Sequence, residues 1–244
     1  MEHEIWFTAI LNKLLAGVLT PGLTALHVPP ADPAHPIPNY LAMEILVLGV
    51  ILVGALLLKR RLSVETPGKF QHLMEVVVEF VRNMSSEIIG HGATRYVSLL
   101  GTLGIFILVC NVFGLIPTLD TPTGHIEVTL GLAVAAFVYY NYQGFRHHGP
   151  IGYLKTFWGP IWWLGFLLFP VELISNTFRL LSLSVRLYAN MFAGELLEKV
   201  FGAMLPVVLP ATMMALHVFV SFIQAYIFVL LPAVYISLAV AEEH

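Results

Sequence analysis

Long apolar runs alternate with short polar segments along the chain, and this pattern predicts an all-α polytopic membrane protein. A helix that spans a bilayer needs about 20 predominantly apolar residues. Five runs qualify by length and composition: 40–58, 96–116, 126–142, 160–195 and 200–241. We therefore expect a single membrane domain over 40–244, preceded by an N-terminal segment over 1–39, with five transmembrane helices if each run forms one helix.

The last run is too long for a simple span. A continuous helix over 200–241 would measure about 60 Å at about 1.5 Å per residue, twice the hydrocarbon thickness of about 30 Å. Such a helix must tilt strongly, bend or be divided into two spans. Pro206, Pro210 and Pro232 permit a bend or a break, so the run itself leaves these possibilities open.

Residues 71–90 show a different pattern, which predicts an amphipathic helix lying in the membrane interface. Apolar side chains such as Leu73 and Val77 recur at helical spacing, while Glu75 and Glu79 recur on another face. A second short amphipathic helix is expected over 5–19, before a proline-rich connector.

Composition supports a membrane protein and excludes several other classes. The chain is 58% apolar and 11% charged, whereas soluble domains carry about 25% charged residues. The net charge of −3 gives no indication of a nucleic-acid partner. The chain has no phosphate-binding G-x-x-x-x-G-K-[ST] loop, and its single cysteine, Cys110, cannot form an internal disulfide.

Basic residues predict the orientation in the membrane. They gather between the first and second runs and again after the third: Lys59, Arg60, Arg61, Lys69, Arg82, Arg95, Arg146 and Lys155. The connection 117–126 has none. By the positive-inside rule, we expect 59–95 and 143–159 in the cytoplasm, the N-terminus outside and the C-terminus inside.

A polar seam interrupts the apolar surface of the fourth run. Positions seven apart lie nearly in line on a helix, and Glu172, Arg179 and Arg186 have this spacing. A charge near the bilayer centre costs about 2.5–3.5 kcal/mol, which favours a functional role for Arg186. Arg179 can instead extend to the interface, with Glu172 only as its structural partner. The whole seam contains Glu172, Ser175, Asn176, Arg179, Ser182, Arg186 and Asn190.

A shorter seam follows in the last run, where His217, Ser221 and Gln224 share one helical face. Glu195 is expected in the hairpin between the two runs, where antiparallel packing brings it and Asn190 close to His217. This arrangement predicts a hydrated, titratable path into the membrane. His217 alone would equally serve as an interhelical hydrogen-bonding group.

The other histidines lie in loops, termini or the interfacial helix, and their spacing indicates no metal site. They are His3, His27, His35, His72, His91, His125, His147, His148 and His244.

The stretch SLSVRLYANMFAGE, with HVFVSFIQAYIFVLLPAVYISLAVAEEH downstream, resembles subunit a of the F-type ATP synthases, the stator subunit of their membrane proton channel. The resemblance extends from about residue 38 to the C-terminus. It includes ETPGKFQ after the first run, NVFGLIP at the end of the second and EVTL at the start of the third. Two departures are Ala189, where many members have glycine, and Glu127, where asparagine is common.

This resemblance implies that the last two helices are long, strongly tilted and antiparallel beside a rotating ring of c-subunits. Arg186 would face the ring carboxylates. The implied outer half-channel contains Asn111, Asn190, Glu195, His217 and Gln224, and the implied cytoplasmic exit contains Glu172, Ser175 and Arg179.

The resemblance also implies a non-catalytic, ion-translocating subunit of a bacterial inner membrane, without a cofactor. Its partners would be the c-ring, the b-subunits of the peripheral stalk, the rest of the F1Fo complex, lipids and protons, with no nucleic acid. The alternative from another class is a self-contained secondary proton-coupled transporter. That class is expected to show internal repeats with helices broken at mid-membrane, and the sequence has no such repeats.

Overall fold

A computed structural model describes residues 5–25, 35–116, 119–158, 165–204 and 208–240. Over these ranges the chain forms seven α-helices and two short 3₁₀ helices, and it contains no strand. The predicted all-helical fold is thus confirmed for the described residues. The elements are α1 (Trp6–Ala25), α2 (Asn39–Arg61), α3 (Lys69–Ile89), η1 (Ala93–Arg95), α4 (Val97–Phe113), η2 (Pro122–Gly124), α5 (Ile126–Trp158), α6 (Gly165–Met204) and α7 (Val208–Val240).

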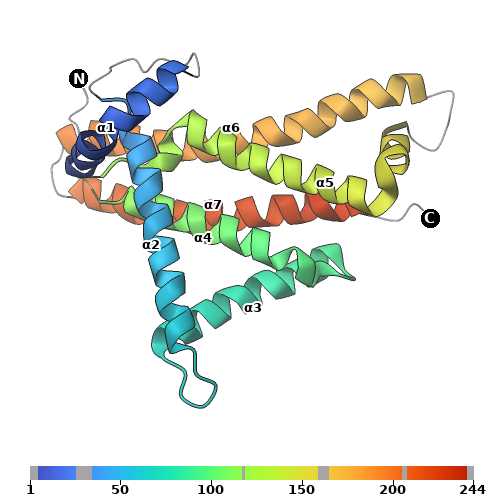
Figure 1. Cartoon of the computed structure of the whole chain (residues 1–244), viewed down its shortest axis with the longest axis horizontal. Helices are drawn as coiled ribbons and strands as arrows, with labels where there is room; N and C mark the ends of the chain where they lie inside the picture. Colours follow the sequence, from blue (N-terminus) through green and yellow to red (C-terminus); the bar gives the residue numbers. More distant parts are fainter. Residues whose placement is uncertain (1–4, 26–34, 117–118, 159–164, 205–207, 241–244) are drawn as a thin grey trace.

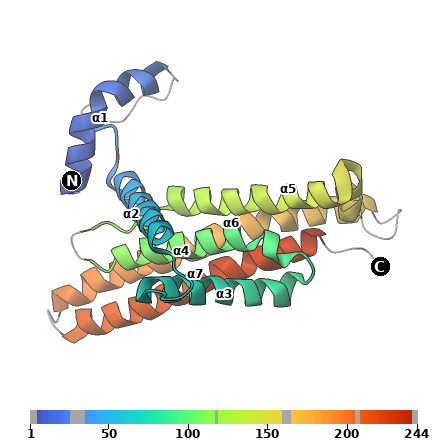
Figure 2. The same ribbon diagram turned by 60° about the horizontal axis from the view of Figure 1, so that its bottom comes forward.

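Helices α4 to α7 lie side by side, and α2 stands across them (Figure 1). After rotation, α1 lies apart from this bundle, beyond the beginning of α2 (Figure 2). Helix α7 contacts α3, α4, α5 and α6, so it occupies the centre of the arrangement. The hydroxyl of Ser237 on α7 also donates a 2.9 Å hydrogen bond to the Ile88 carbonyl on α3.

Two groups of buried apolar side chains hold α7 to its neighbours. The first contains Val81, Met84, Tyr96, Leu100, Tyr140, Tyr153, Val229, Ala233, Ile236 and Ala239. The second contains Leu103, Ile107, Ala133, Ala136, Leu183, Leu187, Met191, Ala225 and Phe228. Small residues let helix backbones approach closely in lipid, where close packing replaces the hydrophobic effect between helices. The alanines of both groups serve this purpose.

Helices α6 and α7 are both longer than a bilayer is thick. With 40 and 33 residues, they measure about 60 and 50 Å, against a hydrocarbon thickness of about 30 Å. Helix α7 continues through Pro210 and Pro232, so the possibility of two short spans does not hold over 208–240. The two helices run in opposite directions, as the resemblance implied (Figure 1).

Three helices have the length and apolar composition to cross a membrane: Asn39–Arg61, Gly165–Glu198 and Ala211–Val240. Helix α4, Val97–Phe113, is apolar but shorter. The described residues therefore form a membrane protein with several apolar helices, while the count of five spans stays a prediction.

Several helix ends differ from the predicted ranges. Helix α5 continues past residue 142 through Arg146, since charged side chains do not end a helix. The first helix-incompatible backbone is at Gly149, where φ is 73° and ψ is 168°. Helix α6 continues to Met204, so Glu195 lies inside a helix and its expected place in the hairpin is wrong. The turn itself falls at 205–207, outside the described residues.

A close contact between α4 and α7 predicts a position that cannot carry a side chain. A β-carbon at Gly104 would lie 2.5 Å from Val229 Cγ2. We expect Gly104→Leu to destabilise the protein by about 1–3 kcal/mol through overpacking, measured as a lower Tm of the detergent-solubilised protein. Gly101→Leu is the matched control, because a β-carbon at Gly101 meets nothing within 4 Å. Equal Tm values for the two variants would contradict the packing argument.

Candidate functional site

His217 is buried where α7 faces α6, with an exposed fraction of 5%. Its Nε2 atom lies 3.4 Å from Met191 Sδ. A β-carbon at Gly194 would lie 3.0 Å from the imidazole Nδ1. Because Gly194 has no side chain, the imidazole of His217 on α7 can pack directly against α6 at this point. Gly194 directly precedes Glu195 in the sequence.

The Glu195 carboxylate packs against the connection between α4 and α5. A β-carbon at Gly124 would lie only 2.9 Å from Glu195 Oε1. Beside this contact, Thr123 Oγ1 donates a 2.6 Å hydrogen bond to Asn111 Oδ1, and both side chains are fully buried. We call Asn111, Thr123, Glu195 and His217 the His217 cluster.

The other predicted residues of this region divide between buried and exposed positions. Ser221 Oγ donates a 2.7 Å hydrogen bond to the His217 carbonyl, which satisfies the hydroxyl within α7. Gln224 is buried, with 3% of its surface exposed. Asn190, in contrast, is exposed on α6 and does not share the buried surroundings of His217.

Glu172 and Arg179 form an ion pair near the beginning of α6. Arg179 Nη2 lies 3.6 Å from Glu172 Oε1. The guanidinium carbon also lies 5.5 Å from the centroid of the Tyr235 ring on α7, a cation–π distance. Ser175 is half-buried on the same helix. The interpretation of Glu172 as a partner of Arg179 therefore agrees with the geometry.

A polar network joins this ion pair to α5. The Tyr140 hydroxyl donates to Asn176 Oδ1, and Asn176 Nδ2 donates a 3.2 Å hydrogen bond to Asn141 Oδ1. Tyr153 donates to the same Asn141 oxygen at 3.0 Å.

We call these seven residues the Arg179 cluster: Tyr140, Asn141, Tyr153, Glu172, Asn176, Arg179 and Tyr235. Most of them line a partly open pocket of about 150 Å³. A water molecule takes about 30 Å³ of liquid volume, so this polar pocket has room for several. The arrangement can therefore hold a hydrated path at this end of α6.

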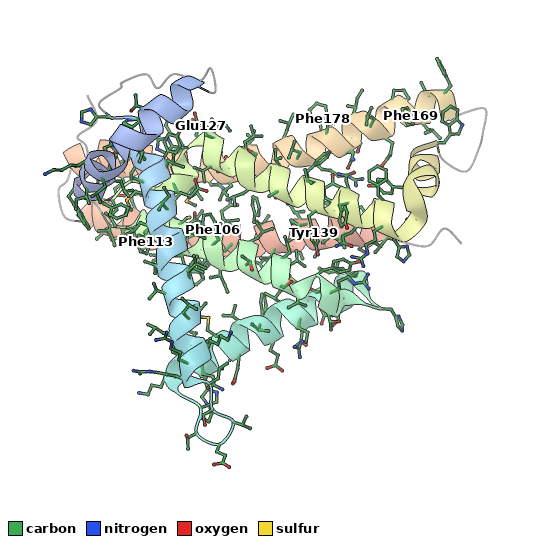
Figure 3. The ribbon with its side chains drawn as sticks, viewed as in Figure 1. Phe106, Phe113, Glu127, Tyr139, Phe169 and Phe178 are labelled. Carbon is green, nitrogen blue, oxygen red and sulfur yellow. The ribbon has the colours of Figure 1, made fainter. Side chains whose placement is uncertain are left out.

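Arg186 lies on α6 between the two clusters, and its side chain is exposed. Within the described residues it takes part in no ion pair or hydrogen bond. Ser182 and Asn190, one turn before and after Arg186 on α6, are also exposed. Exposed apolar side chains border this line: Phe178, Val185 and Phe192 are 62%, 50% and 47% exposed. Figure 3 shows the Phe178 side chain projecting from α6. The exposed line on α6 thus places the Arg186 cation between two neutral polar side chains, with apolar side chains beside them.

The position of Arg186 along α6 separates the two clusters. It is seven residues from Arg179 and nine from Glu195, which corresponds to about 10 and 13 Å along a helix axis. The structure therefore places the two polar clusters at different heights, with the exposed arginine between them.

Two serines of α6 lie in different surroundings. Ser182 is exposed, whereas Ser184 is buried and lies 3.2 Å, hydroxyl to hydroxyl, from Thr129 on α5. Sequence reasoning missed Ser184 because it lies outside the line of seven-residue spacings.

His125 was also missed, because it lies in a connection rather than on a periodic helix face. Its Nε2 atom lies 3.1 Å from Asp120 Oδ2, and its ring stacks on Tyr40 at a centroid distance of 4.7 Å. Glu127, at the beginning of α5, lies at the same end of the bundle (Figure 3).

The charges around His125 favour its protonated form. The hydrogen bond to Asp120 raises the pKa of His125 most strongly, and burial opposes this by lowering it. The negative charges of Asp120, Glu195 and Glu127 raise it further, so the net pKa is above the usual value. Among the described residues, no group of three or more histidine, cysteine or acidic side chains is suited to hold a metal ion.

Comparisons with known proteins agree on one family. The family described as ATP synthase A chain matches residues 41–237. ATP synthase subunit a of Koribacter versatilis is 46% identical over 244 residues, which covers all of both chains. The protein of the same name from Solibacter usitatus is 45% identical over 214 residues, covering 88% of this chain and 92% of the relative. That of Geobacter sulfurreducens is 36% identical over the full length of both. The chain therefore belongs to the ATP synthase A chain family, the subunit a of the membrane Fo sector.

Proposed function

We propose that this chain is the proton-channel stator subunit of a bacterial F-type ATP synthase, with two offset half-channels and Arg186 between them. Family membership supports a role in proton transport and ATP synthesis in a membrane. The observation that carries the proposal is the exposed Arg186 on α6, bordered by exposed apolar side chains and placed between two polar clusters.

In this proposal, the His217 cluster lines the outer half-channel, together with Asn190, Ser221 and Gln224. An imidazole and a carboxylate are side chains that can each take up and release a proton, which a proton path requires. The Arg179 cluster, with Ser175 and Ser182, lines the cytoplasmic half-channel. The partly open pocket of about 150 Å³ at that cluster supports a hydrated exit.

Arg186 would act on the carboxylic acids of a neighbouring c-ring. A protonated acid is neutral and can pass through lipid, whereas beside the guanidinium the carboxylate form is favoured. At about 4 Å and an effective dielectric constant of about 20, the attraction is about 4 kcal/mol, or about 3 pKa units. The proton then leaves through the cytoplasmic half-channel, and the ring advances until the carboxylate is protonated again from the outer one.

The same cation would prevent a direct leak between the half-channels. Each proton that crosses 100 mV releases about 2.3 kcal/mol, and a leak would dissipate this driving force without rotation. Arginine suits the role better than lysine because its guanidinium stays charged even when poorly hydrated.

The proposal places the chain in the bacterial inner membrane, with its N-terminus outside and its C-terminus in the cytoplasm. Its partners are the c-ring, the b-subunits of the peripheral stalk and the rest of the F1Fo complex. The chain itself is non-catalytic: it moves protons, and ATP chemistry takes place elsewhere in the complex. Glu44 has no role in this scheme.

Replacing the cation tests the central role. In Arg186→Ala, the loss of about 4 kcal/mol of attraction corresponds to about a thousandfold, so we expect ATP-driven proton pumping to fall below detection. The measurement is fluorescence quenching in inverted membrane vesicles that contain equal amounts of assembled complex. Arg60→Ala removes an exposed cation at the end of α2 and should pump normally. Normal pumping by Arg186→Ala would refute the role.

The proton relay in the His217 cluster is tested by exchanging its two titratable groups. The double variant Glu195→His with His217→Glu keeps both groups in the same space, so we expect partial pumping activity, above that of Glu195→Leu. Glu198→Gln, a half-buried acid one turn further along α6, is the control and should retain activity. Full pumping by Glu195→Leu would eliminate the relay.

A further inference from the structure

The connection between α4 and α5 carries a pair of titratable groups that the proposed half-channels do not use. His125 Nε2 lies 3.1 Å from Asp120 Oδ2, and the two side chains are 28% and 24% exposed. They are thus sheltered enough to hold a fixed geometry and still open enough to exchange protons with water. The stacked ring of Tyr40 on α2 holds the imidazole from one face.

This pair lies beside the carboxylate of Glu195. Gly124 directly precedes His125, and a β-carbon there would lie 2.9 Å from Glu195 Oε1. The short η2 helix that contains Gly124 contacts α2, α4, α5 and α6. The connection therefore packs against Glu195 and carries the partly exposed His125 next to this contact.

We infer that His125, positioned by Asp120, is the outermost proton-exchanging residue of the inlet and passes protons from the outer solution to Glu195. This inference rests on the proposed function of the His217 cluster as the outer half-channel.

The hydrogen bond to Asp120 leaves one nitrogen of His125 for proton exchange. When Nε2–H donates to Asp120, the neutral ring keeps its lone pair on Nδ1, which can accept a proton from water. The imidazolium then releases that proton, through water, to the Glu195 carboxylate. The imidazole returns to its neutral form, so the step is one proton moved and no other bond changed.

The titratable and charged groups around His125 come from every element packed against it. They are Asp120 in the same connection, Glu127 on α5, Glu195 on α6 and Tyr40 on α2. The three acids favour the imidazolium, so the ring keeps its proton to a higher pH than an isolated histidine. A raised pKa also means that this charge pairing stabilises the connection at low pH, and that the stabilisation is lost as the pH rises through the pKa of the folded protein.

The test is the pH profile of proton-driven ATP synthesis by the whole complex in proteoliposomes. The membrane potential is clamped, and the pH is varied only on the side opposite the ATP-synthesising sector. His125→Gln removes a group that captures protons from the outer solution. We therefore expect the pH at which the rate of ATP synthesis falls to half, on the alkaline side of the profile, to decrease by about one unit. Asp120→Asn should shift it in the same direction, because it removes the anion that favours the imidazolium.

The chain offers a matched control in His72, which lies 3.5 Å from Glu75 in an exposed pair on α3. His72→Gln should leave the profile unchanged. Superimposable profiles for His125→Gln and the parent would overturn the inference, as would an equal loss of rate at every pH, which indicates only a structural effect. If His125→Gln fails to assemble, the Asp120→Asn profile decides in the same way.

Arg186→Ala, assayed in parallel, distinguishes a failure of the proposed function from a failure of the inference about His125. If that variant still synthesises ATP, the proposed function itself fails. If it is inactive while the His125 and Asp120 variants keep the parental profile, only the inference about the inlet fails.

Discussion

An arginine on a lipid-exposed helix face needs a compensating anion or water, because its guanidinium does not lose its charge. Arg186 has no such partner within the described part of its own chain, and exposed apolar side chains border it on α6. The surface of the isolated chain is therefore incomplete. A neighbouring subunit that brings carboxylates to this face would complete it. The proposed roles of the two polar clusters, as half-channels, depend on that contact.

The length of α6 and α7 makes it possible to separate the two clusters. A helix that crosses the membrane along its normal offers about 20 residues, and polar groups at its two ends would lie at opposite surfaces. A helix of 40 residues offers twice that length. On this length, the two proposed half-channels could open from opposite sides and overlap in depth, displaced sideways along the helix. The central position of α7 keeps both of them against the same support.

Sequence patterns predicted the helices better than their ends. The apolar runs identified α2, α4, α5, α6 and α7, because helices in lipid satisfy their backbone internally and need apolar surfaces. Helix α5 extends beyond the predicted end at residue 142. The charged Arg146 does not interrupt the helix, and the backbone first departs from helical angles at Gly149. Glu195 lies inside α6 and not in the hairpin for the same reason: a charged side chain does not end a helix.

The site was predictable where it follows helical spacing and not where it depends on tertiary contacts. The seven-residue repeat pointed to Glu172, Arg179 and Arg186, and the first two do form an ion pair. No periodicity relates Tyr140 to Asn176, or His125 to Asp120, because these pairs form only after separate segments have packed. The connection 119–125 also looked like an ordinary loop, since its contact with Glu195 has no local signature.

Side-chain hydrogen bonds join α5 and α6 at two levels, and they have a mechanical consequence. Asn176 binds Tyr140 near one end of α6, and Ser184 meets Thr129 about two turns further along. A rotor that slides past α6 would exert a sideways drag, and a smooth apolar helix could roll about its own axis in response. Directional bonds at two separate levels resist that rolling. In the proposed complex, they would keep the guanidinium turned toward the rotor while torque is transmitted.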